Sequence, residues 1–282
     1  MGRPMTPADN PILRTIALGG GIQSTTLVLM AAHGEIGPMP DAALFSDLGS
    51  ESTATYEHIR WLSSPNVLPF PIRTIQPGNI ITDILSCATD SNYSGFTRIP
   101  YFVDNGPDPA GHGTRDCTNR YKVNPLTQEH RRILGVPAFK NIRPNTVEVW
   151  LGISTDEASR MKPARSAWQV NRWPLIEKGM SRRDCMAWLK RHDYPVPPRS
   201  SCVFCPYHSD SEWDRIKRDE PEAWGKAVAI DHSLREQHKA ANLSGSPYLH
   251  RSMRPLDQVD FTPGGDRQAN LFSAECEGLC SG

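Results

Sequence analysis

The spacing of cysteines gives the first sign of chemistry in this sequence. Two residues separate Cys202 from Cys205 in "SSCVFCPYH". This spacing lets both sulfurs reach one metal ion from a tight turn. Cys117 would supply a third thiolate, and three thiolates suit an iron–sulfur cluster or a zinc ion. The spacing also leaves open a redox-active dithiol or plain packing.

Two further cysteines, Cys276 and Cys280, lie in the terminal segment "AECEGLCSG". A thiol there can act as a nucleophile, or it can swing in as a fourth ligand of a cluster, and the sequence does not choose between these roles. The ordinary alternative is a frayed end without a role. We expect at least one of the two thiols to be functional.

A glycine-rich turn, "ALGGGIQSTT" over residues 17–26, is the second candidate site. It separates an apolar run from a helical pattern, and the amides and dipole at a helix start attract an anion. A Walker loop would need a lysine after the last glycine, and none is present. The candidate ligand-binding residues are Gly19, Gly20, Gly21, Gln23, Ser24 and Thr25.

A dinucleotide-binding turn is a weaker alternative for the same residues. It would have a third glycine where Ser24 stands, although Asp47 ends the next strand as an acidic ribose partner would. A tight glycine turn that binds nothing is the remaining alternative.

The first half of the chain, which contains these candidate residues, alternates between strand and helix patterns. Apolar runs predict strands at 12–18, 41–47, 69–75 and 146–154, and helical spacing predicts helices at 24–33, 53–64 and 79–88. This alternation predicts an α/β fold with a parallel sheet covered by helices on both faces. The glycine-rich turn would then lie at the carboxyl edge of the sheet, where ligands bind.

The second half of the chain is predicted to be mainly helical. Helix patterns cover 181–194, 209–218 and 221–237, with proline-rich connections between them. We therefore expect a nucleotide-binding domain over 1–165 and a smaller helical, cysteine-bearing lobe with a mobile tail over 166–282.

Composition limits the partners of the chain. Its 31 basic and 31 acidic residues balance, so the overall charge indicates neither a nucleic-acid binder nor a membrane binder. No apolar stretch could cross a bilayer and the N-terminus lacks a secretory pattern, so we expect a cytoplasmic protein. Seven cysteines, an odd number, favour metal binding or catalysis over disulfides in that compartment. A local group of basic residues could still contact phosphates of nucleic acid or ATP, namely Arg115, Arg120, Lys122, Arg131 and Arg132.

Together these motifs resemble the PP-loop superfamily of N-type ATP pyrophosphatases. Gly20, Gly21 and Ser24 match its pyrophosphate loop, with Gly19 where the family usually has serine. The resemblance implies a five-stranded parallel sheet that binds ATP or an adenylylated sulfate.

Within that superfamily the chain is similar to sulfonucleotide (PAPS/APS) reductases, DNA phosphorothioation proteins and cluster-dependent tRNA thiolases. "RDCTNRYKVNPL" matches at Cys117 and Lys122, with Thr118 in place of a second cysteine. "LGISTDEASRMKP" matches at Gly152 and Arg160, and an arginine there can grip a phosphate or sulfate with two hydrogen bonds. An exposed, charged helix start explains the latter segment equally well.

The resemblance implies one of two enzyme activities. In the first, ATP adenylylates a substrate oxygen with Mg²⁺ as counterion, and sulfur held by a [4Fe–4S] cluster then displaces AMP. In the second, Cys276 attacks the sulfur of an adenylyl sulfate, and a thiol reductant releases sulfite. Cys117, Cys202 and Cys205 would be the cluster ligands.

A third, non-enzymatic hypothesis is a subunit of a nucleic-acid modification system with structural zinc. The sequence leaves open which molecule accepts the sulfur, and the candidates include a nucleobase and a nucleic acid. It also leaves open the sulfur donor and the oligomeric state, a homodimer included.

Overall fold

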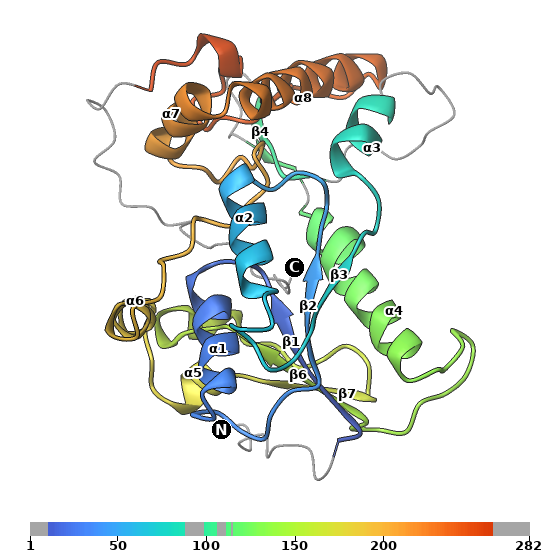
Figure 1. The fold of residues 1–282 in the computed structure, drawn as a ribbon. Helices are drawn as coiled ribbons and strands as arrows, with labels where there is room; N and C mark the ends of the chain where they lie inside the picture. Colours follow the sequence, from blue (N-terminus) through green and yellow to red (C-terminus); the bar gives the residue numbers. More distant parts are fainter. Residues whose placement is uncertain (1–10, 88–98, 106–110, 114, 262–282) are drawn as a thin grey trace.

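The computed structural model describes residues 11–87, 99–105, 111–113 and 115–261 (Figure 1). At its centre is a five-stranded sheet in the order β3-β2-β1-β6-β7, and every neighbouring pair is parallel. The expected α/β class and five-stranded parallel sheet are confirmed. The strands are β1 (Leu13–Leu18), β2 (Ala42–Ser46), β3 (Ile72–Ile75), β6 (Val147–Leu151) and β7 (Gln169–Arg172).

The strand order reverses at β1. The chain runs outward from β1 through β2 to β3, and then returns to place β6 on the other side of β1 and β7 beyond it. In open parallel sheets such a switch point opens a crevice at the carboxyl ends of the strands. The turns that follow β1 and β6 therefore meet at this edge.

Both faces of the sheet are buried, as expected for parallel strands. Ile16 and Leu18 face an apolar core formed with helices on one side, whereas Leu13 and Ala17 face the core on the other. The first core includes residues of α1 (Ile22–Ala32), α2 (Thr53–Leu62), α5 (Pro174–Glu177) and α6 (Arg182–Arg191). The second core lies under α4 (Asn124–Ile133), on the far side of the sheet from α1 (Figure 1).

A third apolar core builds a smaller lobe above the sheet. It joins α3 (Ile80–Cys87), α7 (Asp210–Asp219) and α8 (Pro221–Ala240), which lie together in Figure 1. A small antiparallel sheet completes it, with strands β4 (Phe102–Asp104), β5 (Gly111–His112) and β8 (Ser246–Tyr248) in the order β5-β4-β8. The helices predicted at 209–218 and 221–237 are thus present, but they pack on segments from the first half of the chain.

The sheet continues past the domain boundary predicted at residue 165. β7 begins at Gln169 and pairs with β6 from Val147 to Trp150. α6 follows and contributes Cys185, Trp188 and Leu189 to the core of the α1 face. Residues 169–191 therefore belong structurally with the parallel sheet.

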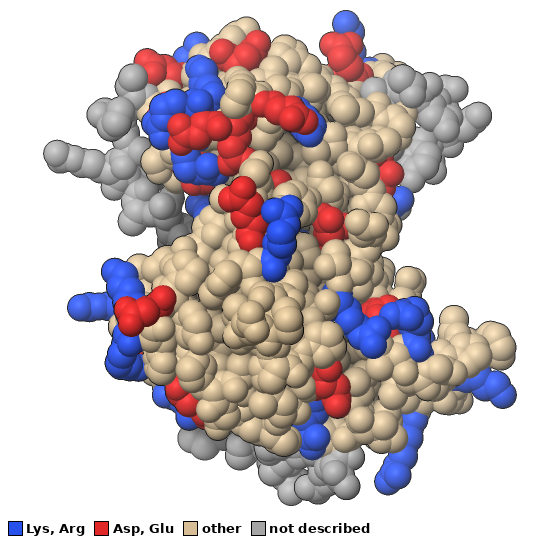
Figure 2. All heavy atoms as spheres, viewed as in Figure 1, with Lys and Arg blue, Asp and Glu red and all other residues tan. Residues whose placement is uncertain are grey.

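Charges on the smaller lobe are paired rather than segregated. Figure 2 shows basic and acidic side chains side by side over this lobe. The pairs include Arg215 with Glu220 at 2.7 Å and Arg218 with Asp214 at 3.1 Å. This face therefore presents mixed charge, unlike the basic surfaces that bind nucleic-acid phosphates.

Among the described residues, none of the helices combines the length and the apolar character that a membrane crossing requires.

Candidate functional site

The turn from β1 into α1 has the backbone expected of a glycine-rich loop. Gly20 has a φ of +84°, in the left-handed region that favours glycine. Gly21 is the N-cap of α1, and no side chain caps the helix there. All residues from Gly19 to Thr26 are buried. The Ser24 hydroxyl donates to the Gly21 carbonyl at 3.3 Å, so it is used within the turn.

Gly152, which directly follows β6, touches the same turn. A Cβ at this position would lie 2.8 Å from the backbone nitrogen of Ser24 and 2.9 Å from its Cα. Only a residue without a side chain allows this approach of two backbones. The structure therefore brings Gly152 and Ser24 together, from motifs far apart in the sequence.

Gln23 links the turn to the segment that carries Arg160. Its amide nitrogen donates to Glu157 at 3.1 Å and lies 3.3 Å from the Ser154 hydroxyl. Glu157 also forms an ion pair with Arg160 at 2.8 Å. Arg182, at the start of α6, donates to Oε1 of the Gln23 side chain at 2.9 Å. Gln23 and Arg160 are thus connected through one carboxylate.

Two other predicted residues have their side chains engaged within the protein. Asp47 accepts hydrogen bonds from the Gly49 amide at 2.8 Å and from the Tyr56 hydroxyl at 2.7 Å. Burial, and secondly Asp47, raise the pKa of Tyr56, so Tyr56 stays protonated and keeps donating. The hydroxyl of Thr25 is 2.9 Å from Nε2 of His58. Both hydrogen bonds to Asp47 end on its Oδ1, so a ligand can use Oδ2 without displacing them.

Two buried histidines next to the sheet give a pH prediction. Burial lowers the pKa of His58 and of His130 to about 4. In the unfolded chain each imidazole titrates near pH 6.5, so the unfolded state binds protons first as the pH falls. The free energy of unfolding should therefore be highest above about pH 6.5, fall by on the order of 2 kcal/mol per histidine toward pH 4.5, and level off below about pH 4.

Urea unfolding measured between pH 7.5 and 4 tests this dependence. His130→Gln should flatten the slope, because one proton fewer is taken up on unfolding. The matched control is His33→Gln, which removes a histidine from an exposed position. A steep slope retained in His130→Gln would contradict the prediction.

A buried cation and carboxylate lie beside the turn. Lys122 belongs to a π-helical segment, Asn119–Val123, that runs into α4. Its Nζ is 3.9 Å from Oε1 of Glu51, and both side chains are at most 5 % exposed. The Ser200 hydroxyl donates to the carbonyl of Gly19, and its oxygen lies 3.3 Å from Oε2 of Glu51. Lys122 is therefore placed at the turn through Glu51 and Ser200.

The Cys202–Cys205 segment forms a tight turn at the same edge. The Cys205 amide donates to the Cys202 carbonyl at 2.9 Å, and the Val203 amide donates to the Ser50 carbonyl at 2.8 Å. Burial, and secondly the negative charge of Glu51, raise the pKa of the Cys202 thiol well above its usual value. Cys202 is thus a neutral thiol in this arrangement.

Within the part of the chain that the structure describes, no three His, Cys, Asp or Glu side chains come close enough to hold a metal ion. Cys117 and Cys202 both pack against the apolar core of the smaller lobe, but the two sulfurs and Cys205 do not form such a group. A cluster or zinc ion on these three thiolates stays a prediction. Cys276 and Cys280 lie outside the described residues.

Three of the five basic residues predicted to contact phosphates bind other groups of this protein. Arg132 binds Glu129 through two hydrogen bonds of 2.6 Å, and Arg131 donates to two backbone carbonyls. Lys122 is buried beside Glu51.

Sequence reasoning missed Glu51 and Ser200, which join the turn to the cysteines. Glu51 stands a few residues after β2 and Ser200 directly before the cysteine pair. The only signals in the sequence were the position of Glu51 after a strand and that of Ser200 beside a motif. Glutamate and serine are common at such positions, so neither residue type indicates a site.

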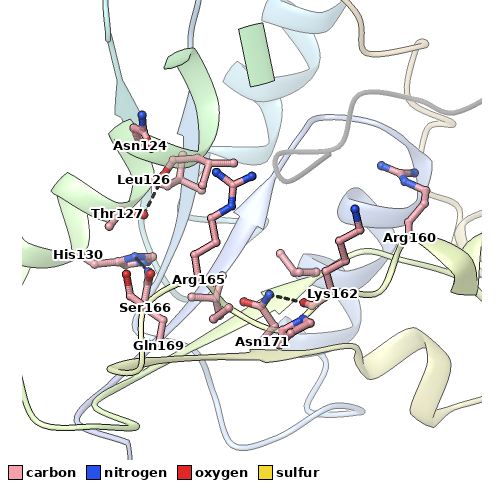
Figure 3. Close-up of a pocket in the computed structure, with 15 residues that line it drawn as sticks. Asn124, Leu126, Thr127, His130, Arg160, Lys162, Arg165, Ser166, Gln169 and Asn171 are labelled. Atoms are coloured by element: carbon pink, nitrogen blue, oxygen red, sulfur yellow. Dashed lines mark hydrogen bonds between the residues drawn. The ribbon is translucent and has the colours of Figure 1, made fainter. Parts of the chain in front are cut away.

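Leu126 of α4 lines two cavities. One of about 10 Å³ lies at Gly19, Ser46 and Lys122, which is room for about one water molecule. This cavity by itself is too small for a nucleotide. A larger cavity of about 310 Å³ lies between α4 and the strands β6 and β7, and Figure 3 shows Arg160, Lys162 and Arg165 on one side of it.

No family model matches the sequence, and no curated protein does. Among solved structures, the chain is similar to a phosphoadenylyl-sulfate (PAPS) reductase from Candida auris in complex with phosphate. The identity is 15 %, the match covers 67 % of this chain and 76 % of the reductase chain, and the TM-score is 0.43. The strand order of the chain itself identifies the fold as an open parallel α/β sheet.

Proposed function

We propose that this chain is an enzyme that binds an adenine nucleotide at the carboxyl edge of the sheet and replaces a substrate oxygen, once ATP has activated it, with sulfur. The observation that carries the proposal is the attachment of the Cys202–Cys205 turn to the β1–α1 turn. Ser200 bonds to Gly19, and Val203 bonds to Ser50. Two thiols are thereby held beside a helix start of the kind that binds phosphates.

The proposed reaction has two steps without net oxidation. First, a hydroxyl oxygen or the oxygen of an amide carbonyl attacks the α-phosphorus of ATP, and pyrophosphate leaves. The proton is lost from the hydroxyl in the first case and from the amide nitrogen in the second. A hydrosulfide ion then attacks the activated carbon, the C–O bond breaks, and AMP leaves. Splitting the exchange in this way replaces a poor leaving group with a good one.

Each group at the edge has a part in this proposal. The amides at the start of α1 would bind the phosphates, and Arg160 would hold a phosphate oxygen once released from Glu157. Mg²⁺ is typically bound by phosphates and by one or two carboxylates, for which Asp47 and Glu51 are the candidates. Cys202 and Cys205 would position the incoming sulfur.

Product analysis tests the activity. Full-length protein, purified without oxygen, is incubated with labelled ATP, hydrosulfide and candidate acceptors, and we expect pyrophosphate and AMP in equal amounts. Release of sulfite from an adenylyl sulfate without ATP cleavage would instead identify a sulfonucleotide reductase. A zinc-containing protein with neither activity would favour the non-enzymatic subunit.

A cysteine variant tests the role of the turn. Cys202→Ser should lower AMP release more than about tenfold and leave ATP affinity within about twofold. Cys185→Ala serves as the control, because Cys185 is buried in the core of the α1 face, so it should affect stability but not turnover. Full turnover in Cys202→Ser would remove Cys202 from the mechanism.

A further inference from the structure

The cavity between α4 and strands β6 and β7 is separate from the β1–α1 turn. None of the fifteen residues that line it belongs to residues 19–26. Its apolar wall comes from Leu126 of α4 and from Val149 and Leu151 of β6, all at most 5 % exposed. A cavity walled by such side chains costs stability unless something fills it. With about 310 Å³, it is within the range of small-molecule sites.

The charge of the lining is one-sided. It contains three cations, Arg160, Lys162 and Arg165, and no carboxylate among its described residues. Arg160 is paired with Glu157 outside the lining, and Lys162 and Arg165 belong to the same lining. Figure 3 shows the long side chains of these two residues extending in the same direction. A concave surface with one sign of charge concentrates ligands of the opposite sign.

The inner wall is polar but uncharged. His130, 1 % exposed, lies 2.9 Å through Nδ1 from the amide nitrogen of Gln169 and 2.8 Å through Nε2 from the hydroxyl of Thr15. An amide nitrogen can only donate, so Nδ1 accepts and the proton is on Nε2. This fixes a neutral imidazole. The amides of Asn124 and Asn171 also line the space, and they can bond to the edge of a ring.

We propose that this cavity binds a free, ring-bearing organic phosphate of the nucleoside monophosphate type. The apolar wall would contact the face of the ring, the amides its edge, and Lys162 and Arg165 the phosphate. The volume suits one such molecule rather than a strand. Binding is independent of the proposed function.

Calorimetric titration with uridine monophosphate tests the site, because this probe lacks the adenine of the nucleotide substrate. We expect binding, with uridine and inorganic phosphate each at least about tenfold weaker, since each lacks one half of the interactions. Arg165→Gln should weaken binding about tenfold through loss of a charge-assisted hydrogen bond. Ala164→Leu, which fills the cavity without changing charge, should weaken it as well.

The matched control is Lys178→Gln, because Lys178 is an exposed cation outside the lining and should leave the affinity unchanged. No binding of uridine monophosphate, or equal binding of inorganic phosphate, would overturn the proposal. If an oligouridylate bound more tightly than uridine monophosphate, the proposal of a free monophosphate as ligand would be wrong. Binding that Ser24→Ala removes and Arg165→Gln leaves intact would move the probe to the β1–α1 turn, whereas loss of ATP cleavage alone would count only against the proposed function.

Discussion

Gly152→Ala is expected to weaken nucleotide binding at least about tenfold and to lower the free energy of unfolding by about 2 kcal/mol. The added Cβ would lie 2.8 Å from the backbone nitrogen of Ser24 and 3.1 Å from the carbonyl carbon of Gln23. Backbone atoms cannot turn aside as a side chain can, so the β1–α1 turn must shift. Calorimetry with ATP and urea unfolding of the same preparation would measure the two effects.

The control for this substitution is Gly225→Ala in α8. Nothing lies within 4 Å of the Cβ that alanine would add there, and alanine favours a helix over glycine by about 0.5–1 kcal/mol. We expect a small gain in stability and unchanged ATP affinity. Normal ATP affinity in Gly152→Ala would show that the contact with Ser24 does not shape the nucleotide site.

Lys122→Met should lower the free energy of unfolding by about 3–5 kcal/mol. Lys122 and Glu51 are both buried, with their charged atoms 3.9 Å apart, and the variant removes the ammonium beside a buried carboxylate. Neutralising the carboxylate as well should restore much of the loss, since the cost comes from the remaining charge. Urea unfolding of Lys122→Met, Glu51→Gln and the double variant measures this coupling.

Arg218→Met provides the comparison with an exposed pair. Arg218 and Asp214 lie 3.1 Å apart with both side chains more than half exposed, and exposed pairs contribute little. We expect no marked change in stability. If the double variant lost as much stability as the sum of the single variants, the two buried charges would not be coupled.

The sequence predicted the fold best where apolar runs are long. β1, β2 and β6 are buried along nearly their whole length, and each was predicted within a few residues. β7 reads "QVNR" and is only half-buried at the edge of the sheet, so it lacks the apolar run that marked the others. The two- and three-residue strands of the smaller lobe are too short for any period to show.

Helix α4 shows a second reason for a missed element. The helical patterns in the sequence predict no helix over residues 124–133, and Pro125 stands in the first turn of this one. Proline is tolerated in the first turn of a helix, where its missing amide has no partner to lose, and the π-helical residues 119–123 precede it without a break. The proline therefore sits near a helix start and does not mark a loop.

Part of the candidate site could be predicted because it is encoded in short motifs. Gly152 against Ser24 is such a case. The contact between Ser200 and Glu51 joins residues 149 positions apart, and neither residue type announces a partner. Such contacts depend on the tertiary packing of the whole chain, which local patterns do not contain.

The bond between Ser200 and the carbonyl of Gly19 spans 181 positions, and it has a consequence for synthesis. A ribosome delivers the glycine turn early and its partner late, and the segments between them can fold as they emerge. A nascent chain can therefore assemble much of the parallel sheet before this closing contact exists. A chain released before residue 200 would contain the glycine-rich turn but would lack the serine whose hydroxyl donates to the carbonyl of Gly19.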